Sequence, residues 1–263
     1  MTSTPEQIYY ENQSIWSWET FKEGREFVRL AACADMIPSD AASVLDMGAG
    51  NGAFLKVLEA RGGSMKLSGL ERSAMAIDSA VCDAAIVSGT LETVPFEDHS
   101  VDVVSALDVV EHLPFGVYEQ ALKEIQRVAR KYILINVPYR EQRLKAICPY
   151  CGCEFNPHYH LRTFDEEVLG RLFPEFRVRE YHRIYLDESV AKVILRPFRR
   201  YVFSKFLETT ICPQCSYQRQ PAAQEDSQVQ ATFLLQSIRR VSARLPTVKV
   251  VAEIGVLYER VLP

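Results

Sequence analysis

Residues 44–54 read Val-Leu-Asp-Met-Gly-Ala-Gly-Asn-Gly-Ala-Phe, an apolar run that ends in a carboxylate and continues into a loop with three glycines in five positions. Glycine adopts a positive φ without strain and lets a ligand approach the backbone closely. Residues 53–60 then show the apolar spacing of a helix that packs on a sheet. The stretch predicts a strand, a nucleotide-type loop and a helix, with a cofactor across the carboxyl end of the strand.

The glycines alone do not identify that cofactor. Gly48, Gly50 and Ala53 also fit the looser dinucleotide fingerprint, and Glu71 follows at the distance expected of a ribose-binding carboxylate. Asp46, however, ends the strand where it would repel a pyrophosphate and attract an ammonium group. S-adenosylmethionine has an amino-acid end and no phosphate, so the sequence favours this cofactor over NAD.

Two later blocks appear in the expected order. Residues 89–104 read Gly-Thr-Leu-Glu-Thr-Val-Pro-Phe-Glu-Asp-His-Ser-Val-Asp-Val-Val, and residues 106–113 read Ala-Leu-Asp-Val-Val-Glu-His-Leu. Together with the glycine loop they make residues 40–185 resemble a class I S-adenosylmethionine-dependent methyltransferase of the type 11 kind. The resemblance implies an α/β, Rossmann-like, doubly wound sheet of seven strands with an antiparallel last strand.

The same resemblance implies a cofactor site. The glycine loop would hold the methionine part, Glu71 would hold both ribose hydroxyls, and the residues after the third strand would contact adenine. Many relatives have an aspartate at this last place, where this chain has Thr90, so the adenine contacts are the least defined part of the site. The implied cofactor-binding residues are Asp46, Gly48, Ala49, Gly50, Asn51, Gly52, Glu71, Arg72, Thr90, Leu91 and Leu107.

Alternating strand and helix patterns support a mostly parallel sheet. We expect strands at 44–47, 65–70, 84–87, 101–107 and 132–137, with helices at 52–60, 73–80 and 117–129. Residues 176–185 would form the sixth strand, and residues 250–259 would run antiparallel between the fifth and the sixth. The expected parts are a helical cap in 1–40, the cofactor-binding core in 41–186, an insertion in 187–249 and the last core strand in 250–263.

Five of the seven cysteines form two clusters, Cys-Pro-Tyr-Cys-Gly-Cys at 148–153 and Cys-Pro-Gln-Cys at 212–215. Two C-x2-C turns predict a structural zinc ion that staples the insertion to the core, and a cytosolic chain disfavours disulfides. Free or redox-active thiols are the alternative, and Cys153, His158 or His160 could replace one ligand. The predicted ligands are Cys148, Cys151, Cys212 and Cys215.

Two histidines are candidate catalytic residues. The pattern His160-x-Arg162-x-Phe164 is similar to a segment of small-molecule and sugar methyltransferases that faces the acceptor, so His160 could bind substrate or accept a proton. Arg162 would orient His160 or bind an acceptor anion. The alternative is a loop contact in which Thr163 caps the next helix. His112 is the second candidate, because histidine titrates near neutral pH, although in many relatives the Glu-His pair only supports the cofactor loop.

The insertion contains a polar linker at 218–230, a helical pattern at 231–245 and a basic, aromatic stretch at 192–206. The last could rest on a membrane surface, although a packing helix with solvated arginines is the commoner case. No apolar run is long enough to cross a bilayer and the first residues are polar, so we expect a cytoplasmic protein. A net charge of −4 makes nucleic acid an unlikely general partner.

The sequence therefore predicts O-methylation of a small hydroxylated acceptor, sugar-like or a secondary metabolite. The combined motifs resemble methyltransferases of bacterial glycan or secondary-metabolite pathways. A nucleic-acid or protein methyltransferase would use the zinc insertion for recognition. However, residues 108–111 read Asp-Val-Val-Glu where base N-methyltransferases have Asn/Asp-Pro-Pro-Tyr/Phe. A non-catalytic binding protein would have lost its cofactor contacts, and an NAD-dependent oxidoreductase would bind a nicotinamide cofactor in this loop. The acceptor atom and the oligomeric state are not predicted.

Overall fold

The computed structural model describes residues 5–141, 145–194, 211–217 and 246–261. The predicted linker at 218–230, the predicted helix at 231–245 and most of the basic stretch at 192–206 lie outside the described residues. The chain divides into two compact units, which we name the cysteine unit and the sheet unit. The cysteine unit comprises Met1–Tyr9, Gln142–His160 and Tyr185–Val251, and the sheet unit comprises Tyr10–Glu141, Leu161–Ile184 and Ala252–Pro263.

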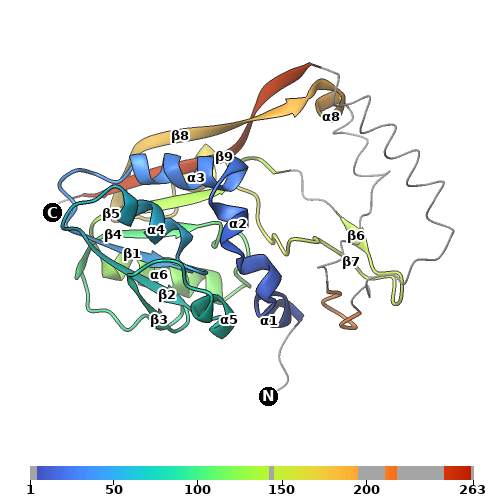
Figure 1. Ribbon diagram of the computed structural model, residues 1–263, viewed down its shortest axis with the longest axis horizontal. Helices are drawn as coiled ribbons and strands as arrows, with labels where there is room; N and C mark the ends of the chain where they lie inside the picture. The colour runs from blue at the N-terminus through green and yellow to red at the C-terminus, as the bar shows by residue number, and fades with distance from the viewer. Residues whose placement is uncertain (1–4, 142–144, 195–210, 218–245, 262–263) are drawn as a thin grey trace. The chain divides into compact units, whose positions relative to one another are not determined.

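A seven-stranded sheet of order β3-β2-β1-β4-β5-β9-β8 forms the framework (Figure 1). The pairs β1–β2, β1–β4, β2–β3 and β4–β5 are parallel, whereas β5 and β9 are antiparallel. The predicted fold class is confirmed, including the position of the antiparallel last strand between β5 and β8. The strands are β1 (Ser43–Met47), β2 (Lys66–Glu71), β3 (Ala85–Ser88), β4 (Val101–Leu107), β5 (Ala129–Pro138), β8 (Phe176–Ser189) and β9 (Thr247–Arg260).

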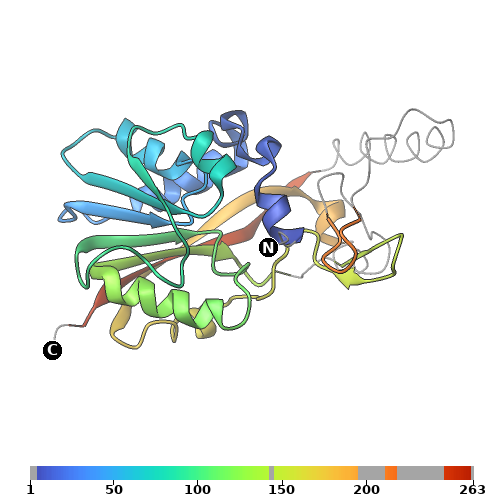
Figure 2. The same ribbon diagram turned by 90° about the horizontal axis from the view of Figure 1, so that it is seen from below.

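Helices cover both faces of this sheet, as Figure 2 shows, with α6 on the face opposite α4. Successive side chains of a strand point to opposite faces, so β1 sends Leu45 to one apolar cluster and Val44 to the other. The first cluster packs against α6 (Val117–Val128) and α7 (Glu166–Leu169), and the second against α3 (Gly24–Asp35) and α4 (Ala53–Ala60). Both faces of the central strands are therefore buried. The carboxylates Asp46 and Glu71 lie at the ends of β1 and β2.

The described residues before β1 contain the helices expected of the cap in 1–40, but the helical stretch is broken into pieces. The pieces are α1 (Pro5–Tyr10), η1 (Gln13–Trp16), α2 (Trp18–Phe21) and α3. Ser17 and Glu23 adopt extended backbone immediately before α2 and α3, which separates the helices. A short helix, α5 (Ala74–Asp78), follows β2 and begins at Ser73, whose hydroxyl accepts a hydrogen bond from the Ala76 N–H.

The cysteine unit contains elements that the sequence did not predict. The strands β6 (Ala146–Ile147) and β7 (Glu154–Phe155) pair antiparallel and flank the first cysteine loop. The helix α8 (Val190–Ile194) follows β8. Two-residue strands bury little apolar surface, so other interactions must stabilise these loops.

Candidate cofactor site and cysteine cluster

The loop after β1 is tied to the end of the neighbouring strand. The N–H groups of Gly48 and Ala49 both donate to the Leu70 carbonyl oxygen, at 2.8 and 3.0 Å. Gly48, Gly50 and Gly52 have φ values of 79°, 55° and 75°. A Cβ on Gly50 would lie 2.6 Å from the Trp16 ring. The loop therefore needs glycine there for its conformation and for close packing.

Glu71 connects the end of β2 to this loop. Its carboxylate is 7% exposed and accepts hydrogen bonds from the N–H groups of Gly50 at 2.9 Å and of Arg72 and Ser73 at 2.8 Å. The cap of α5 is Ser73, so Glu71 is not the capping residue that a purely structural role would suggest. These three hydrogen bonds hold the Glu71 carboxyl group beside the glycine loop.

Asp46 lies at the end of β1, directly before the loop. It is 3% exposed, and the Ser105 hydroxyl donates to it at 2.7 Å. Desolvation raises the pKa of Asp46 to about 7, although the Ser105 hydrogen bond and the Arg29 charge act in the opposite direction and the Glu71 charge adds to the rise. A ligand ammonium at this carboxyl would restore its ionised form.

A buried charge network that the sequence did not predict joins α3 to β4, β5 and β9. The Arg29 guanidinium is 5% exposed, with Nε 3.3 Å from Asp108 Oδ2 and 3.5 Å from Glu253 Oε2, and its Nη2 donates to Glu26 at 2.8 Å. The Asn136 amide donates to Glu253 at 2.9 Å. Burial lowers the pKa of Arg29, but the neighbouring carboxylates raise it by more than burial lowers it. The net pKa is therefore raised, and the side chain stays charged. The spacing of apolar residues in α3 predicts which face of the helix is buried. The sequence near Arg29 does not show that Asp108 and Glu253, far along the chain, are its partners.

Aromatic residues near the N-terminus contact the glycine loop. The Asn51 amide donates to the Trp16 carbonyl oxygen at 2.9 Å, and the Trp16 indole N–H donates to the Tyr10 carbonyl oxygen at 2.7 Å. The Arg72 guanidinium lies 5.3 Å from the centre of the Tyr10 ring. The Tyr10 and His112 rings are perpendicular, with 6.0 Å between ring centres. These contacts place aromatic side chains at the loop that is predicted to hold the cofactor.

The remaining predicted cofactor residues lie near the carboxyl ends of β3 and β4. Thr90 is exposed and forms an isolated antiparallel bridge with Thr93. Leu91 packs against the first apolar cluster, and Leu107 is buried at the end of β4. Thr90 and Leu91 thus lie after β3, in the segment where the resemblance expects adenine contacts.

Glu111 and His112 lie in the turn after β4. The Glu111 side chain is 1% exposed, and its Oε1 is 3.9 Å from His112 Nε2. Arg162 does not extend away from this turn: its guanidinium donates to the Leu113 carbonyl oxygen and lies 3.8 Å from the centre of the Tyr118 ring. Arg162 therefore orders the turn in this structure.

His160 belongs to the cysteine unit, so the two candidate histidines come from different units. The backbone N–H groups of His158 and His160 donate to Asn156 Oδ1 at 2.8 and 3.3 Å. The suggested Thr163 cap is wrong, because Asp165 caps α7 by accepting from the Val168 N–H at 3.0 Å. Aspartate has a stronger acceptor than threonine, and Asp165 directly precedes the helix.

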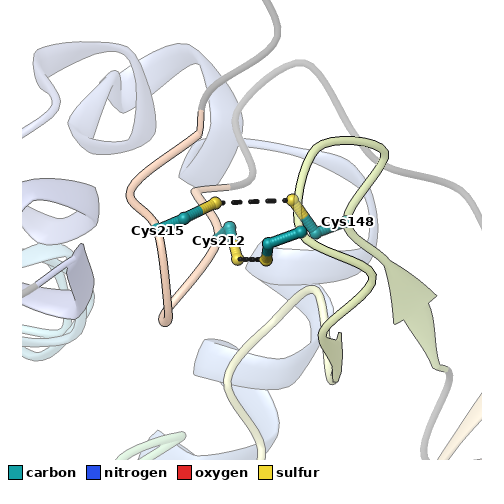
Figure 3. A group of neighbouring side chains, drawn as sticks. Cys148, Cys212 and Cys215 are labelled. Carbon is teal, nitrogen blue, oxygen red and sulfur yellow. Dashed lines mark hydrogen bonds between the residues drawn. The ribbon is translucent and has the colours of Figure 1, made fainter.

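The structure brings the four predicted cysteines together (Figure 3). The sulfur atoms of Cys148 and Cys215 are 3.7 Å apart, those of Cys151 and Cys212 are 3.6 Å apart, and all four lie within 4.8 Å of one another. Sulfur atoms at the corners of a tetrahedral zinc site lie about 3.8 Å apart, because the Zn–S bond is about 2.3 Å. The donor set and its spacing fit zinc. Cys153 is outside this group of described residues.

The two cysteine loops share a backbone hydrogen-bond pattern. The Cys148 N–H donates to the Cys153 carbonyl oxygen and the Cys212 N–H to that of Tyr217, both at 2.9 Å. A residue with positive φ follows the second cysteine of each loop, Gly152 at 74° and Ser216 at 58°. Repeated loop geometry around four sulfur atoms is typical of paired metal-binding turns.

The first cysteine of the pair already has a lowered pKa. Desolvation opposes this, but the backbone N–H groups of Cys151 and Tyr150 donate to the Cys148 sulfur and bring the pKa of its thiol to about 7. The pKa values of Cys151 in the same loop and of Cys215 are raised by contrast, so a metal that binds all four sulfur atoms would have to displace protons.

Comparison with known proteins agrees with this geometry. Residues 45–133 match the family described as Methyltransferase domain, and this range covers the glycine loop, Glu71 and the Glu111–His112 turn. No curated protein matches the chain. The sheet order and the antiparallel β9 are those of the Rossmann-like methyltransferase fold. Among the described residues no helix is long and apolar enough to cross a membrane.

Solved structures share the fold at low sequence identity. The complex between the Haloferax volcanii Trm112 methyltransferase activator and a candidate methyltransferase gives a match at 15% identity and a TM-score of 0.56, covering 99% of both chains. A Thermotoga maritima S-adenosylmethionine-dependent methyltransferase, described as a candidate histamine N-methyltransferase, matches at 16% identity and 0.54, covering 98% of this chain and 99% of that one. A candidate methyltransferase from an antibiotic biosynthesis pathway of Anabaena variabilis matches at 17% and 0.54, covering 89% and 97%.

Proposed function

We propose that the sheet unit binds S-adenosylmethionine and transfers its methyl group to an oxygen atom of a small hydroxylated acceptor, sugar-like or a secondary metabolite. The observation that supports this most directly is the pair of buried carboxylates, Asp46 and Glu71, beside the glycine loop. Asp46 would repel a pyrophosphate and complement an ammonium group, and Glu71 complements a ribose diol.

The roles of the chain's own residues follow from this arrangement. Asp46 faces the ammonium group and Glu71 accepts from the ribose hydroxyls, while the glycine loop lets the ligand approach the backbone. Thr90 and Leu91 contact adenine after β3, and Arg72 and Leu107 complete the site. When bound, S-adenosylmethionine supplies an electrophilic methyl group on a sulfonium sulfur.

The enzyme then has to align the acceptor and remove a proton. The acceptor oxygen forms a bond to the methyl carbon as the carbon–sulfur bond breaks, and that bond's electron pair stays on sulfur. The hydroxyl proton must pass to a base or to water. His112 and His160 are the two candidate bases, one in each unit.

We also propose that Cys148, Cys151, Cys212 and Cys215 hold a structural zinc ion. Four thiolates fill a tetrahedral site, so this ion would stabilise the cysteine unit and would not activate water. The separation of 3.6 to 3.7 Å between sulfur atoms of paired cysteines supports this role.

A second candidate is a macromolecular acceptor recognised by the cysteine unit. Tyr150 is 78% exposed, and its ring is parallel to that of Tyr217, with 6.1 Å between the ring centres. Exposed aromatic rings serve as stacking surfaces in nucleic-acid and protein recognition. The Haloferax volcanii complex shows a protein of this fold with a protein partner.

A methyl-transfer assay with radiolabelled S-adenosylmethionine separates the candidates. The acceptors would be free sugars, phenols, transfer RNA and protein extract, offered separately. We expect label in a small hydroxylated compound; label only in RNA or protein would support the second candidate. Glu71→Gln should lower the rate at least about tenfold through a lost charged hydrogen bond. The control Glu124→Gln changes another mostly buried carboxylate, on α6, and should stay close to wild type.

A further inference from the structure

Glu111 is a buried carboxyl group to which no other described residue donates a hydrogen bond. Its side chain is 1% exposed, and neither carboxyl oxygen accepts a hydrogen bond from another described residue. Asp46 and Glu253, by contrast, accept from Ser105 and Asn136. A buried carboxyl with so few donors destabilises a fold unless a ligand completes its contacts, so Glu111 is a candidate ligand-binding group.

The charges around Glu111 favour a positive ligand. Burial raises the pKa of Glu111 well above its usual value, and the charges of Asp108 and Glu253 raise it further against the effect of Arg29. The adjacent His112 directs Nε2 to within 3.9 Å of the Glu111 carboxyl. A cation in contact with Glu111 would give its carboxyl oxygens a partner. It would also offset the repulsion between Glu111 and the carboxylates of Asp108 and Glu253.

The turn that carries the two side chains is ordered by the main chain. The His112 N–H donates to the Val109 carbonyl oxygen at 3.0 Å, and the Leu161 N–H donates to the Glu111 carbonyl oxygen at 2.8 Å. Val109 also packs on the glycine loop, since a Cβ on Gly48 would lie 2.6 Å from its side chain. Glu111 and His112 are therefore held in a turn that borders the proposed cofactor site.

We propose that Glu111 and His112 bind a divalent metal ion at the carboxyl end of β4. A carboxylate and an imidazole are the oxygen and nitrogen ligands that Mn²⁺, Fe²⁺ and Zn²⁺ accept. Two protein ligands leave coordination positions for oxygen atoms of the acceptor, as in catalytic metal sites. This second metal differs from the cysteine-bound ion, whose ligands are all sulfur.

The role of this metal rests on the proposed function, although its binding does not. A hydroxyl coordinated to a divalent ion loses its proton to water more readily. The oxygen then forms a bond to the methyl carbon while the carbon–sulfur bond breaks and its electron pair stays on sulfur, which leaves the neutral thioether. The metal would thus select acceptors with chelating hydroxyl groups.

The test is a titration of the whole chain with Mn²⁺, followed by electron paramagnetic resonance, after EDTA has removed loosely bound ions. Mn²⁺ prefers oxygen and nitrogen to thiolate, so the four cysteines do not compete for it. We expect a single saturable site in the wild type. Glu111→Gln and His112→Gln should each weaken it at least about tenfold, and Glu124→Gln should not change it.

S-adenosylhomocysteine binding, measured on the same samples by calorimetry, separates the two proposals. Glu111→Gln should bind this ligand as the wild type does, which also shows that the variant is folded. A folded wild type without a Mn²⁺ site, or a Glu111→Gln variant with unchanged Mn²⁺ affinity, would overturn the metal site. A protein that binds Mn²⁺ but no S-adenosylhomocysteine would keep the metal site and overturn the proposed function.

Discussion

The glycine loop of the sheet unit and the cysteine loops of the cysteine unit obtain their shapes in different ways. The glycine loop is buried, and its N–H groups donate hydrogen bonds to the Leu70 carbonyl oxygen and the Glu71 carboxylate. The cysteine loops are flanked by two-residue strands and converge on four sulfur atoms. Hydrogen bonds within the chain determine the first geometry, whereas we propose that a bound metal ion stabilises the second.

Removing one sulfur ligand should give the largest effect and should act on one unit. Cys212→Ser leaves an incomplete tetrahedral site, and metal binding contributes about 10–16 kcal/mol in zinc-finger peptides. We expect loss of bound zinc by elemental analysis and loss of the cysteine unit's cooperative thermal transition. Hydrogen exchange should show that the strands β1, β2 and β4 stay protected.

Cys153→Ser is the matched control, because Cys153 lies outside the four-sulfur group. This variant should keep its zinc. Equal zinc loss from both variants would mean that the fifth cysteine is a ligand, and zinc retention by Cys212→Ser would remove the contrast between the two regions.

Adding a methyl group to the glycine loop should act on the sheet unit. Gly50→Ala brings strain from its φ of 55°, about 1–2 kcal/mol, and a clash with the Trp16 ring. We expect S-adenosylhomocysteine affinity to fall at least about tenfold, which corresponds to about 1.4 kcal/mol. The control is Gly62→Ala. Gly62 has a φ of 72°, but a Cβ there would meet nothing within 4 Å, so this variant adds backbone strain without a clash. Equal affinities for the two variants would contradict the packing argument.

Asp46 should make ligand binding depend on pH. Its raised pKa of about 7 means that the folded chain keeps a proton which the unfolded chain loses near pH 4, so this group destabilises the fold as pH rises from about 4 to 7. A bound ammonium group would expel that proton. Affinity for S-adenosylhomocysteine should therefore rise with pH, by at most about tenfold per unit below pH 7, and then level off.

Calorimetry in buffers of different ionisation enthalpy measures the released proton. The Arg29 and Glu71 charges also act on this carboxyl, and Asp46→Asn should remove the pH dependence because it deletes the group that releases the proton. A dependence that persists in Asp46→Asn would assign the proton to another group.

The smallest expected effect is a change in the stability of the cysteine unit when the positive-φ residues of its two loops are exchanged. Ser216 adopts a φ of 58° where the other loop has Gly152. Ser216→Gly should stabilise the cysteine unit by up to about 1 kcal/mol through relief of left-handed strain, and Gly152→Ala should destabilise it by a similar amount. Opposite shifts of the thermal transition are the expected result; shifts of the same sign would contradict the equivalence of the loops.

The sequence predicted the parts of the molecule that depend on neighbouring residues. The alternation of β1, its glycine loop and α4 is local, and so is the C-x2-C spacing, which is why the sheet and the cysteine group were found. Asp165 shows the limit of such reasoning, since it takes the capping role that Thr163 was expected to fill.

The rest depends on partners far apart in the chain. Arg29 on α3 is paired with Asp108 after β4 and with Glu253 on β9, and no local pattern links these residues. The unpaired state of Glu111 is also visible only once its surroundings are known. Both features depend on which groups surround a buried ionisable side chain, and the spacing of residues along the sequence does not show this.

The most direct test of the proposed function is calorimetric titration of the purified, zinc-containing protein with S-adenosylhomocysteine and, separately, with NAD. We expect micromolar binding of S-adenosylhomocysteine and no binding of NAD, because Asp46 complements an ammonium group and repels a pyrophosphate, while Glu71 complements the ribose diol. Binding of NAD alone, or of neither ligand by the folded protein, would contradict the assignment of this loop to a methyl donor.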